Sequence, residues 1–590
     1  MTETKTRERT RDQPRSTSSR LIAFARVRDR IILPIWDGLR LDYTGLAFAS
    51  LFFCWSLTPS LLPRDWLFQG LIGGLNAAIG YGFGTALGWL ARRLFLNRMP
   101  WWPLHDPWGP ALKVFVVISS IVVSIVVLVY SAGWQREIAH MMGAERTTTS
   151  GYIRTGLLSL LVAATIVAVW RSLREIVRWI AGRVIRLLRV SLPVAKTIGF
   201  VTVAAISLLL IDGVLLRGSY SAVNNIFSLE NTTTRDGAVQ PQSPQRSGSP
   251  DSIAPWDTLG FQGRDFVSRG MSTEAMEAVN GRPALEPIRV YAGLDTADTA
   301  DKRMDVVIDE LERTGAFSRS VLVVIPTTGT GWVNPTAAAA IELVANGDSA
   351  LVASQYSYLP SWISFLADRH KAAEAGKLLI DRVRDRWLQE PEETRPKLMI
   401  YGESLGTQAG EGAFTDLGDL RSKVDGVLWV GPPNSNHLWR ALVDRRDPGT
   451  TEVAPQYSHG MVVRFADSTT DLENGDSEWL SPRVLYLQHA TDPVVWWSTD
   501  LIFTRPDWLH EPPGNARTPS MKWFPIVTFW QVSADLTNAA GVPNGHGHNY
   551  GTLVLDGWVS VVQPEGWTAA DTERARVALD YYIENSGPEK

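Results

Sequence analysis

The sequence predicts an α-helical transmembrane bundle followed by a soluble α/β domain with a mostly parallel sheet. Five apolar stretches occupy residues 44–218, and each is long enough for a helix to cross a bilayer, which takes about 20 residues. From residue 257 onward, short β-rich runs alternate with helix-length patterns, which favours parallel strands that are covered on both faces. At 590 residues the chain is too long for one ordinary domain, so a division of this kind is expected.

The composition excludes several other classes of protein. Charged residues make up 20% and apolar residues 45% of the chain, which argues against wholesale disorder and fibrous repeats. The formal net charge of −4 provides no global basic field, so we expect no nucleic-acid partner. Cys54 is the single cysteine, which rules out a disulfide framework and thiolate metal sites.

The five predicted spans differ in strength. They lie near residues 44–63, 67–90, 110–132, 152–170 and 197–216. The first is interrupted by Pro59 and the second by glycines that include Gly70, Gly73 and Gly74. Because small residues let helices approach closely in lipid, these glycines predict helix contacts inside the bundle.

The loop charges predict the orientation of the bundle. Segments 1–43, 91–113 and 171–196 carry 10, 4 and 7 Lys/Arg, and such an excess marks the cytoplasmic side. The sequence therefore predicts a cytoplasmic basic segment at 1–43 and a transmembrane domain at 44–218, with the rest of the chain outside. Residues 219–256 are rich in Ser, Thr, Gln and Pro towards their end, which predicts a flexible linker before a catalytic domain at 257–590.

The second half has the pattern of an open parallel sheet. Apolar runs of strand length are separated by helical stretches near 301–313, 336–346, 366–388 and 405–416. The predicted strands are 288–292, 320–325, 350–354, 397–401, 424–430 and 484–489. About 330 residues are ample for one core of this type.

The fourth predicted strand ends in Gly-Glu-Ser-Leu-Gly, residues 402–406, and leads directly into a helix of small residues. A serine on such a strand-to-helix turn is held in a strained conformation that exposes its hydroxyl, and Gly402 and Gly406 are needed because side chains there would collide with neighbouring elements. The pentapeptide alone is a weak signal, but its context is the one that a nucleophile requires. Ser404 is therefore the predicted nucleophile.

A serine nucleophile needs a histidine base that a carboxylate orients. Asp492 follows the strand 484–489, at the edge of the sheet where ligand sites collect, and is the predicted acid. Asp467 and Asp500 are its competitors.

Two histidines in the glycine-rich segment 545–550 compete for the role of base, and we favour His548 over His546. Their spacing would also suit a metal, but no cysteine or acidic cluster completes such a site, so we expect no metal and no cofactor.

An oxyanion hole requires two backbone N–H groups that point at the developing negative charge. Leu405, which follows the nucleophile, is expected to supply one of them. The second is expected from Thr328 or Gly329, in the glycine-containing loop after strand 320–325. The absence of a Gly-Lys-Ser/Thr sequence in that loop disfavours a phosphate-binding interpretation.

These motifs resemble the bacterial family of multi-pass membrane α/β-hydrolases, in which a transmembrane domain precedes an α/β-hydrolase domain. The matching segments are Leu57–Arg64, Gly260–Phe266, Pro326–Trp332, Gly402–Gly406 and Gly545–His548. The resemblance implies serine-hydrolase chemistry of the lipase or esterase type.

The predicted placement outside the membrane makes envelope lipids the expected partners and acyl esters the expected substrates, with the protein in the cell membrane. Trp496 and Trp497 follow the predicted acid closely, so they are candidates for an acyl pocket or for contact with lipid headgroups. Two alternatives remain open: an acyltransferase that uses the same three residues, and a transport or scaffold protein whose hydrolase-like domain only binds.

Overall fold

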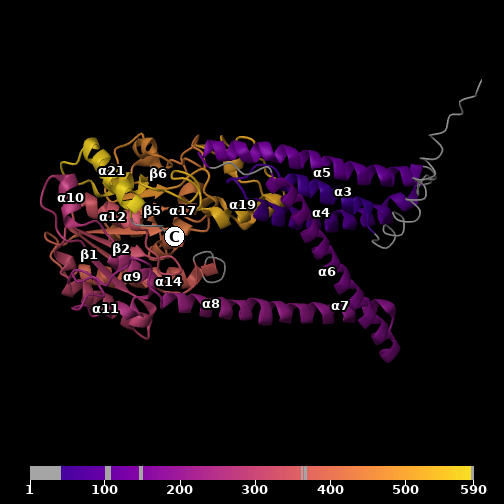
Figure 1. The fold of residues 1–590 in the computed structure, drawn as a ribbon, viewed down its shortest axis with the longest axis horizontal. Helices are drawn as coiled ribbons and strands as arrows, with labels where there is room; N and C mark the ends of the chain where they lie inside the picture. Colours follow the sequence, from indigo (N-terminus) through magenta and orange to yellow (C-terminus); the bar gives the residue numbers. More distant parts are fainter. Residues whose placement is uncertain (1–40, 100–107, 145–149, 361–362, 365–368, 586–590) are drawn as a thin grey trace, which may run out of the picture.

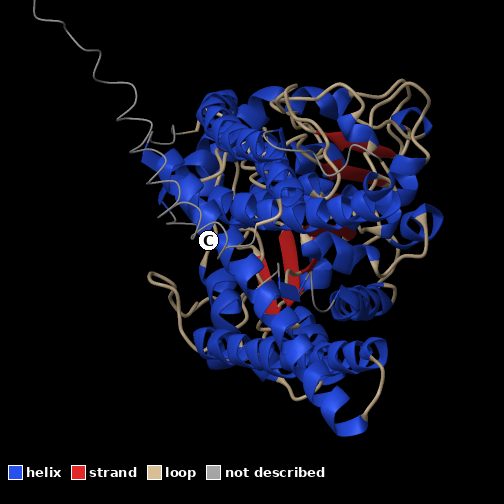
Figure 2. Ribbon diagram, turned by 90° about the vertical axis from the view of Figure 1, so that its right-hand side faces the viewer, coloured by secondary structure: helices blue, strands red, loops and turns tan. Residues whose placement is uncertain are grey.

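The computed structural model describes residues 41–99, 108–144, 150–360, 363–364 and 369–585. Most of the predicted basic segment 1–43 lies outside these residues. A helical half extends away from a half that contains the sheet (Figure 1). Figure 2, viewed from the side of the helical half, shows the strands with helices around them.

The described strands form a seven-stranded sheet in the order β1-β3-β2-β4-β5-β7-β6, and every neighbouring pair is parallel. The strands are β1 (Ile288–Ala292), β2 (Val321–Pro326), β3 (Ser349–Ser354), β4 (Lys397–Glu403), β5 (Gly426–Val430), β6 (Val463–Ala466) and β7 (Arg483–Leu487). The prediction of a mostly parallel sheet is confirmed. The sequence predicted six of these strands and missed β6, which has four residues and lies at the edge of the sheet.

Helices cover both faces of the sheet because alternate strand residues point to opposite sides. On one face, Leu322 and Val324 pack in a cluster with side chains of α11 and α14. On the other face, Val321 and Val323 pack with side chains of α12, α20 and α21. The helices of this half are α9 (Gly260–Ser268), α10 (Thr273–Asn280), α11 (Ala300–Arg313), α12 (Pro335–Val344), α14 (Arg369–Trp387), α15 (Leu405–Glu411), α16 (Leu417–Lys423), α17 (His437–Asp444), α18 (Pro493–Trp496), α19 (Val527–Asp535), α20 (Leu553–Val562) and α21 (Ala569–Asn585).

The helical half contains fewer candidate membrane spans than the sequence predicted. Among the described residues, three helices are long and apolar enough to cross a membrane: Ala111–Met141, Gly151–Leu188 and Leu192–Gly213. The prediction of five spans is wrong in number. Helix α3 has only 14 residues, and α4 is diluted by its many glycines and by buried polar side chains. The helices are α3 (Tyr43–Ser56), α4 (Trp66–Leu94), α5 (Trp108–Met141), α6 (Ser150–Leu188), α7 (Leu192–Leu209), a π-helical segment (Leu210–Arg217) and α8 (Gly218–Asn231).

The glycines of α4 bring helices into close contact, as the sequence predicted. A Cβ atom on Gly73 would lie 2.5 Å from Ser159 Oγ, and one on Gly74 would lie 2.5 Å from Val162 Cβ. Any side chain at these positions would therefore push α4 away from α6.

The segment predicted as a flexible linker packs against the sheet domain instead. Arg246 forms a parallel bridge with Arg289 of β1, and the Ser247 N–H donates to the Arg289 carbonyl at 3.0 Å. The Ser247 hydroxyl also donates to the buried carboxylate of Glu310 at 2.8 Å. Specific polar contacts hold this segment in place although it has no apolar periodicity, so its composition alone was misleading.

Candidate active site

Ser404 occupies a strained turn at the carboxyl end of β4. Its backbone has φ 55° and ψ −126°, in a region that residues other than glycine rarely adopt, and α15 begins at the next residue. Its N–H donates to the Val430 carbonyl at 2.9 Å, which fixes the turn to β5. The turn thus has the geometry that the sequence predicted for a nucleophile.

The two glycines that flank the turn are required by space. A Cβ atom on Gly402 would lie 2.7 Å from the Gly406 carbonyl oxygen. A Cβ atom on Gly406 would lie 2.5 Å from the Pro326 carbonyl oxygen. The chain can therefore turn from β4 into α15 next to the end of β2 only with hydrogen atoms at both positions.

His548 and Asp492 form the predicted base and acid pair. The His548 Nδ1 atom lies 2.7 Å from Asp492 Oδ2, and the Asp492 side chain is completely buried. Asp492 holds the proton on Nδ1, which leaves Nε2 as the basic nitrogen. The Nε2 atom is buried without a hydrogen-bond partner among the described residues, and His548 lines the same cavity as Ser404.

Hydrogen bonds keep the buried Asp492 ionised. Burial disfavours its charged form, but this effect is outweighed by His548, by the Tyr550 hydroxyl at 2.8 Å from Oδ2 and by the Val494 N–H at 2.8 Å from Oδ1. The pKa of Asp492 therefore lies below its ordinary value. Sequence reasoning missed Tyr550, although it lies two residues after His548 in the same segment.

The competing residues take other places. The Asp467 carboxylate accepts the Ala490 N–H at 3.1 Å, and Asp500 forms an exposed ion pair with Arg440. Neither of these two interactions involves a histidine. The backbone of His546 pairs with that of Asn549, and His546 is not part of the lining of the cavity that contains Ser404 and His548. The geometry thus selects Asp492 and His548 from the alternatives that the sequence left open.

Two further residues that sequence reasoning missed shape the surroundings of His548. Gly431 has φ +56°, and a Cβ atom there would overlap the His548 ring. His489, at the end of the β7 run, donates its Nδ1–H to the Gly547 carbonyl at 2.9 Å and stacks on Tyr550 with ring centroids 4.1 Å apart. The sequence shows a glycine and a histidine at these positions but not which loop they face.

Burial of His489 predicts a specific dependence of stability on pH. Burial lowers the pKa of His489 to about 4, below an unfolded value of about 6.5. Its contribution to stability is therefore fully present above pH 6.5 and is lost as the pH falls to about 4, a change of at most about 3 kcal/mol. We expect the melting temperature of the full-length protein to fall less steeply on acidification in His489→Gln than in the wild type. Parallel melting curves for the two proteins would contradict this expectation.

The loop that was predicted to supply an oxyanion donor borders the site. Thr328 lines the cavity together with Ser404 and His548. The backbone at Gly329 packs so closely against the Leu359 carbonyl that a Cβ atom would overlap it. Leu405 begins α15 directly after the nucleophile. The structure therefore brings the predicted donor segments to the same edge of the sheet as Ser404.

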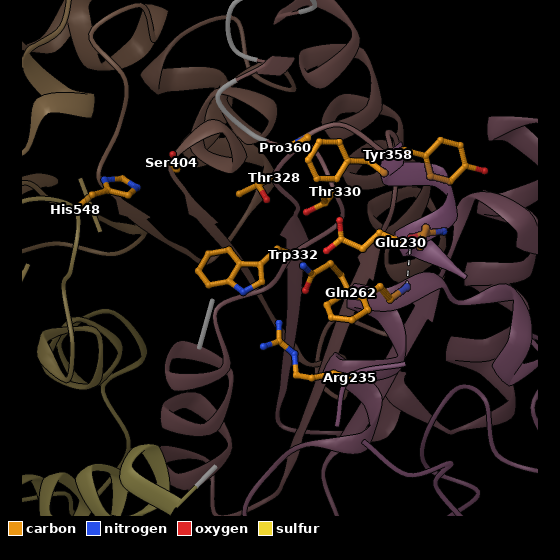
Figure 3. Close-up of a pocket in the computed structure, with 13 residues that line it drawn as sticks. Glu230, Arg235, Gln262, Thr328, Thr330, Trp332, Tyr358, Pro360, Ser404 and His548 are labelled. Carbon is orange, nitrogen blue, oxygen red and sulfur yellow. Dashed lines mark hydrogen bonds between the residues drawn. The ribbon is translucent and has the colours of Figure 1, made fainter. Parts of the chain in front are cut away.

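Ser404, His548 and Thr328 line one cavity, which has a volume of about 400 Å³ (Figure 3). One end holds Ser404 and His548, and the walls include Trp332 and Phe261. The opposite wall comes from α8 and the segment that follows it: Phe227, Glu230, Asn231 and Arg235. A helix that continues from the helical half thus forms part of the wall of the cavity. The sequence had predicted a flexible linker at this place.

The tryptophans that were candidates for a substrate pocket are core residues. Trp496 is completely buried, donates its Nε1–H to the His489 carbonyl at 3.0 Å and packs against Trp439 and Trp508. Trp497 donates to Ser533 at 2.8 Å. Neither belongs to the lining of the cavity, so the substrate-pocket interpretation of this pair is wrong.

Comparison with known proteins agrees with this geometry. A protein-family model described as "Alpha/beta-hydrolase family" matches residues 288–575, and one described as "Alpha/beta-hydrolase family N-terminus" matches residues 57–270. No curated protein and no solved structure matches the chain. Since the two models together account for the helical half and the sheet domain, the chain belongs to the α/β-hydrolase family.

Proposed function

We propose that the protein is a membrane-anchored serine hydrolase that cleaves acyl esters of lipids through an acyl-Ser404 intermediate. One observation carries the proposal: Ser404, on its strained turn, shares a cavity with His548, and the buried Asp492 holds the Nδ1 of that histidine. A domain that only binds ligands would need no such arrangement.

In the first step, His548 Nε2 takes the proton of the Ser404 hydroxyl as the oxygen attacks the ester carbonyl. The negative charge that develops on the carbonyl oxygen is stabilised by backbone N–H groups, for which Leu405 and either Thr328 or Gly329 are the candidates. As the tetrahedral intermediate collapses, His548 returns the proton to the leaving alcohol and the acyl group stays on Ser404.

In the second step, water replaces the alcohol. His548 removes a proton from the water as its oxygen attacks the acyl-enzyme carbonyl, and then protonates Ser404 as the carboxylic acid leaves. Asp492 stays ionised throughout and stabilises the imidazolium that forms in each step. If an alcohol took the place of water, the same residues would carry out acyl transfer.

The position of the cavity supports a lipid substrate. Phe227 of α8 lines it, and α8 follows the apolar helix α7 after a π-helical segment. The apolar side chains of α5 and α7, such as Phe115, Val129, Phe200 and Leu208, are exposed, as expected of helices that face lipid. An ester-bearing lipid would therefore meet the cavity close to the helices that enter the bilayer.

We further propose that the catalytic domain lies outside the cytoplasm. Ile138 and Met142, at the end of α5, pack with the core of the catalytic domain, so this end of the bundle adjoins that domain. The junction of α6 and α7 lies at the end remote from the sheet (Figure 1). That junction belongs to the basic segment 171–196, and an excess of Lys/Arg marks the cytoplasmic side.

Fluorophosphonate labelling tests the chemistry and the orientation together. Membranes that contain full-length wild type should be labelled, and membranes that contain Ser404→Ala should not. Ser354→Ala is the matched control, because Ser354 ends β3 at the same edge of the sheet in ordinary strand conformation, and it should be labelled like the wild type. On intact cells, a charged probe that does not cross membranes should label the wild type as strongly as it does in isolated membranes.

Failure of folded wild type to react would contradict the serine-hydrolase proposal and favour a domain that only binds. Labelling by the charged probe only after cells are opened would contradict the orientation. Lipid esters are then assayed in mixed micelles with and without an acceptor alcohol. Release of free fatty acid supports hydrolysis, whereas a new ester as the main product would establish acyl transfer.

A further inference from the structure

We infer that residues 60–64, in the turn between α3 and α4, position the catalytic histidine, so that the helical half contributes directly to the competence of the active site. This inference rests on the proposed function. We call these residues the docking turn. The proposed role goes beyond anchoring, which needs no contact between the turn and the catalytic machinery.

The docking turn is buried in the catalytic domain. Leu61 and Leu62 are 1% and 0% exposed and belong to the same hydrophobic cluster as Val532 and Val542. Val532 lies in α19, and Val542 lies in the segment that connects α19 to residues 545–550, which carry His548 and are called the histidine loop below. The contact therefore joins the two halves at the elements that lead to His548.

A buried ion pair fixes the docking turn to the end of α19. The Asp535 carboxylate accepts Arg64 Nε–H at 2.8 Å, the Leu61 N–H at 3.1 Å and the Ser60 hydroxyl. Both charged side chains are almost completely buried. Since a buried charge is costly unless it is paired and hydrogen-bonded, this arrangement defines one relative position of the docking turn and Asp535.

Two paths lead from the docking turn to His548. Asp535 ends α19, and four residues later the Ala539 carbonyl accepts the His548 N–H at 2.7 Å. Leu62 also lies directly against Gly547, the residue before His548: a Cβ atom on Gly547 would lie 3.3 Å from Leu62 Cδ2. The docking turn thus supports both the residue before His548 and the carbonyl that holds the His548 backbone.

The opposite side of the loop is held by the catalytic domain itself. The Gly547 N–H donates to Thr491 Oγ1 at 2.9 Å, and the Gly547 carbonyl accepts from His489. Loss of the contact with the docking turn would therefore leave the loop firmly held on the side of Thr491 and His489 and less firmly supported on the side of Ala539. A displacement of about 1 Å between catalytic groups is enough to cost roughly 100-fold in rate.

The test compares Leu62, in the docking turn, with Leu57, which caps the end of α3 before the docking turn, in the full-length protein. Leu62 packs against the histidine loop, whereas Leu57 is equally buried but packs with Phe53 and Cys54 of α3. Both Leu→Ala variants remove the same buried atoms and should lower the melting temperature. We expect Leu62→Ala to lower kcat and the rate of fluorophosphonate labelling about 10- to 100-fold per folded molecule, with KM nearly unchanged. Leu57→Ala should stay within about threefold of the wild type, and Leu62→Met should restore most of the rate.

A milder pair of variants covers the case in which Leu62→Ala does not fold. Ser60→Ala removes a hydrogen bond to the Asp535 carboxylate, and Ser56→Ala removes a buried hydroxyl hydrogen bond within α3, to the Phe53 carbonyl. Only Ser60→Ala should slow labelling. Equal labelling rates for wild type, Leu62→Ala and Ser60→Ala would overturn the inference alone. Failure of the wild type to be labelled at all would overturn the proposed function and the inference with it.

Discussion

Replacement of His548 by glutamine is expected to lower kcat for ester hydrolysis by about 10⁶-fold, because the serine hydroxyl then has no base. Glutamine occupies a similar volume but cannot take a proton from Ser404 or return one to the leaving alcohol. The measurement is steady-state hydrolysis of a soluble ester by purified full-length protein, together with a melting curve to confirm the fold.

His546→Gln provides the control for this prediction. His546 lies two residues away in the same loop, but its hydrogen bonds among the described residues do not include Asp492. We expect its kcat to stay within about tenfold of the wild type. If His546→Gln were the inactive variant and His548→Gln the active one, the assignment of the base would be reversed.

Replacement of Asp492 by asparagine should lower kcat by about 10⁴-fold. The asparagine amide has no charge to stabilise the His548 imidazolium, and its N–H₂ group can turn toward Nδ1 and favour the tautomer with the proton on Nε2. Tyr550 would still contact the side chain, so the fold should be retained. A pH profile of kcat/KM with Ser404 labelling as a second readout separates loss of basicity from loss of protein.

Asp467→Asn is the matched control for Asp492→Asn. Asp467 follows β6, the neighbour of β7 in the sheet, and its carboxylate accepts from the Ala490 N–H. Burial raises the pKa of Asp467 to about 6, so its charge is less favoured than that of an exposed aspartate, and the asparagine oxygen can still accept the Ala490 N–H. Its activity should remain within a few-fold of the wild type. If both variants lost activity equally, any substitution at this edge of the sheet would disable the site, and the assignment of Asp492 as the acid would lose its support.

The sheet and the nucleophile were predictable because the signals are local. Apolar runs of strand length located β1 and β4, and a glycine-flanked serine after β4 fixed the strained turn. The choice between His546 and His548 was less secure, because it depends on which side chain faces an aspartate 56 positions earlier in the chain. The edge strand β6 has only four residues, and Arg464 interrupts its apolar run.

Contacts between distant segments account for what sequence reasoning missed. Nothing in the polar composition of residues 232–256 indicates that Arg246 and Ser247 pair with β1, since these contacts depend on buried partners elsewhere. Likewise, the interpretation of 44–63 as a plain membrane span overlooked the hydrogen bonds of Ser60 and Leu61 to Asp535. Such pairings have no periodicity along the chain, so only the folded structure reveals them.

The separation between the docking turn and its partner has a consequence for biosynthesis. Ser60 and Asp535 are 475 positions apart, and a ribosome that adds about 5–20 residues per second needs on the order of a minute to make the chain between them. The docking turn is therefore inserted well before Asp535 and His548 are synthesised. A chain that ends before His548 carries the nucleophile turn without its base, so we expect the proposed ester hydrolysis to begin only after His548 has been synthesised and the loop that carries it has packed against the docking turn.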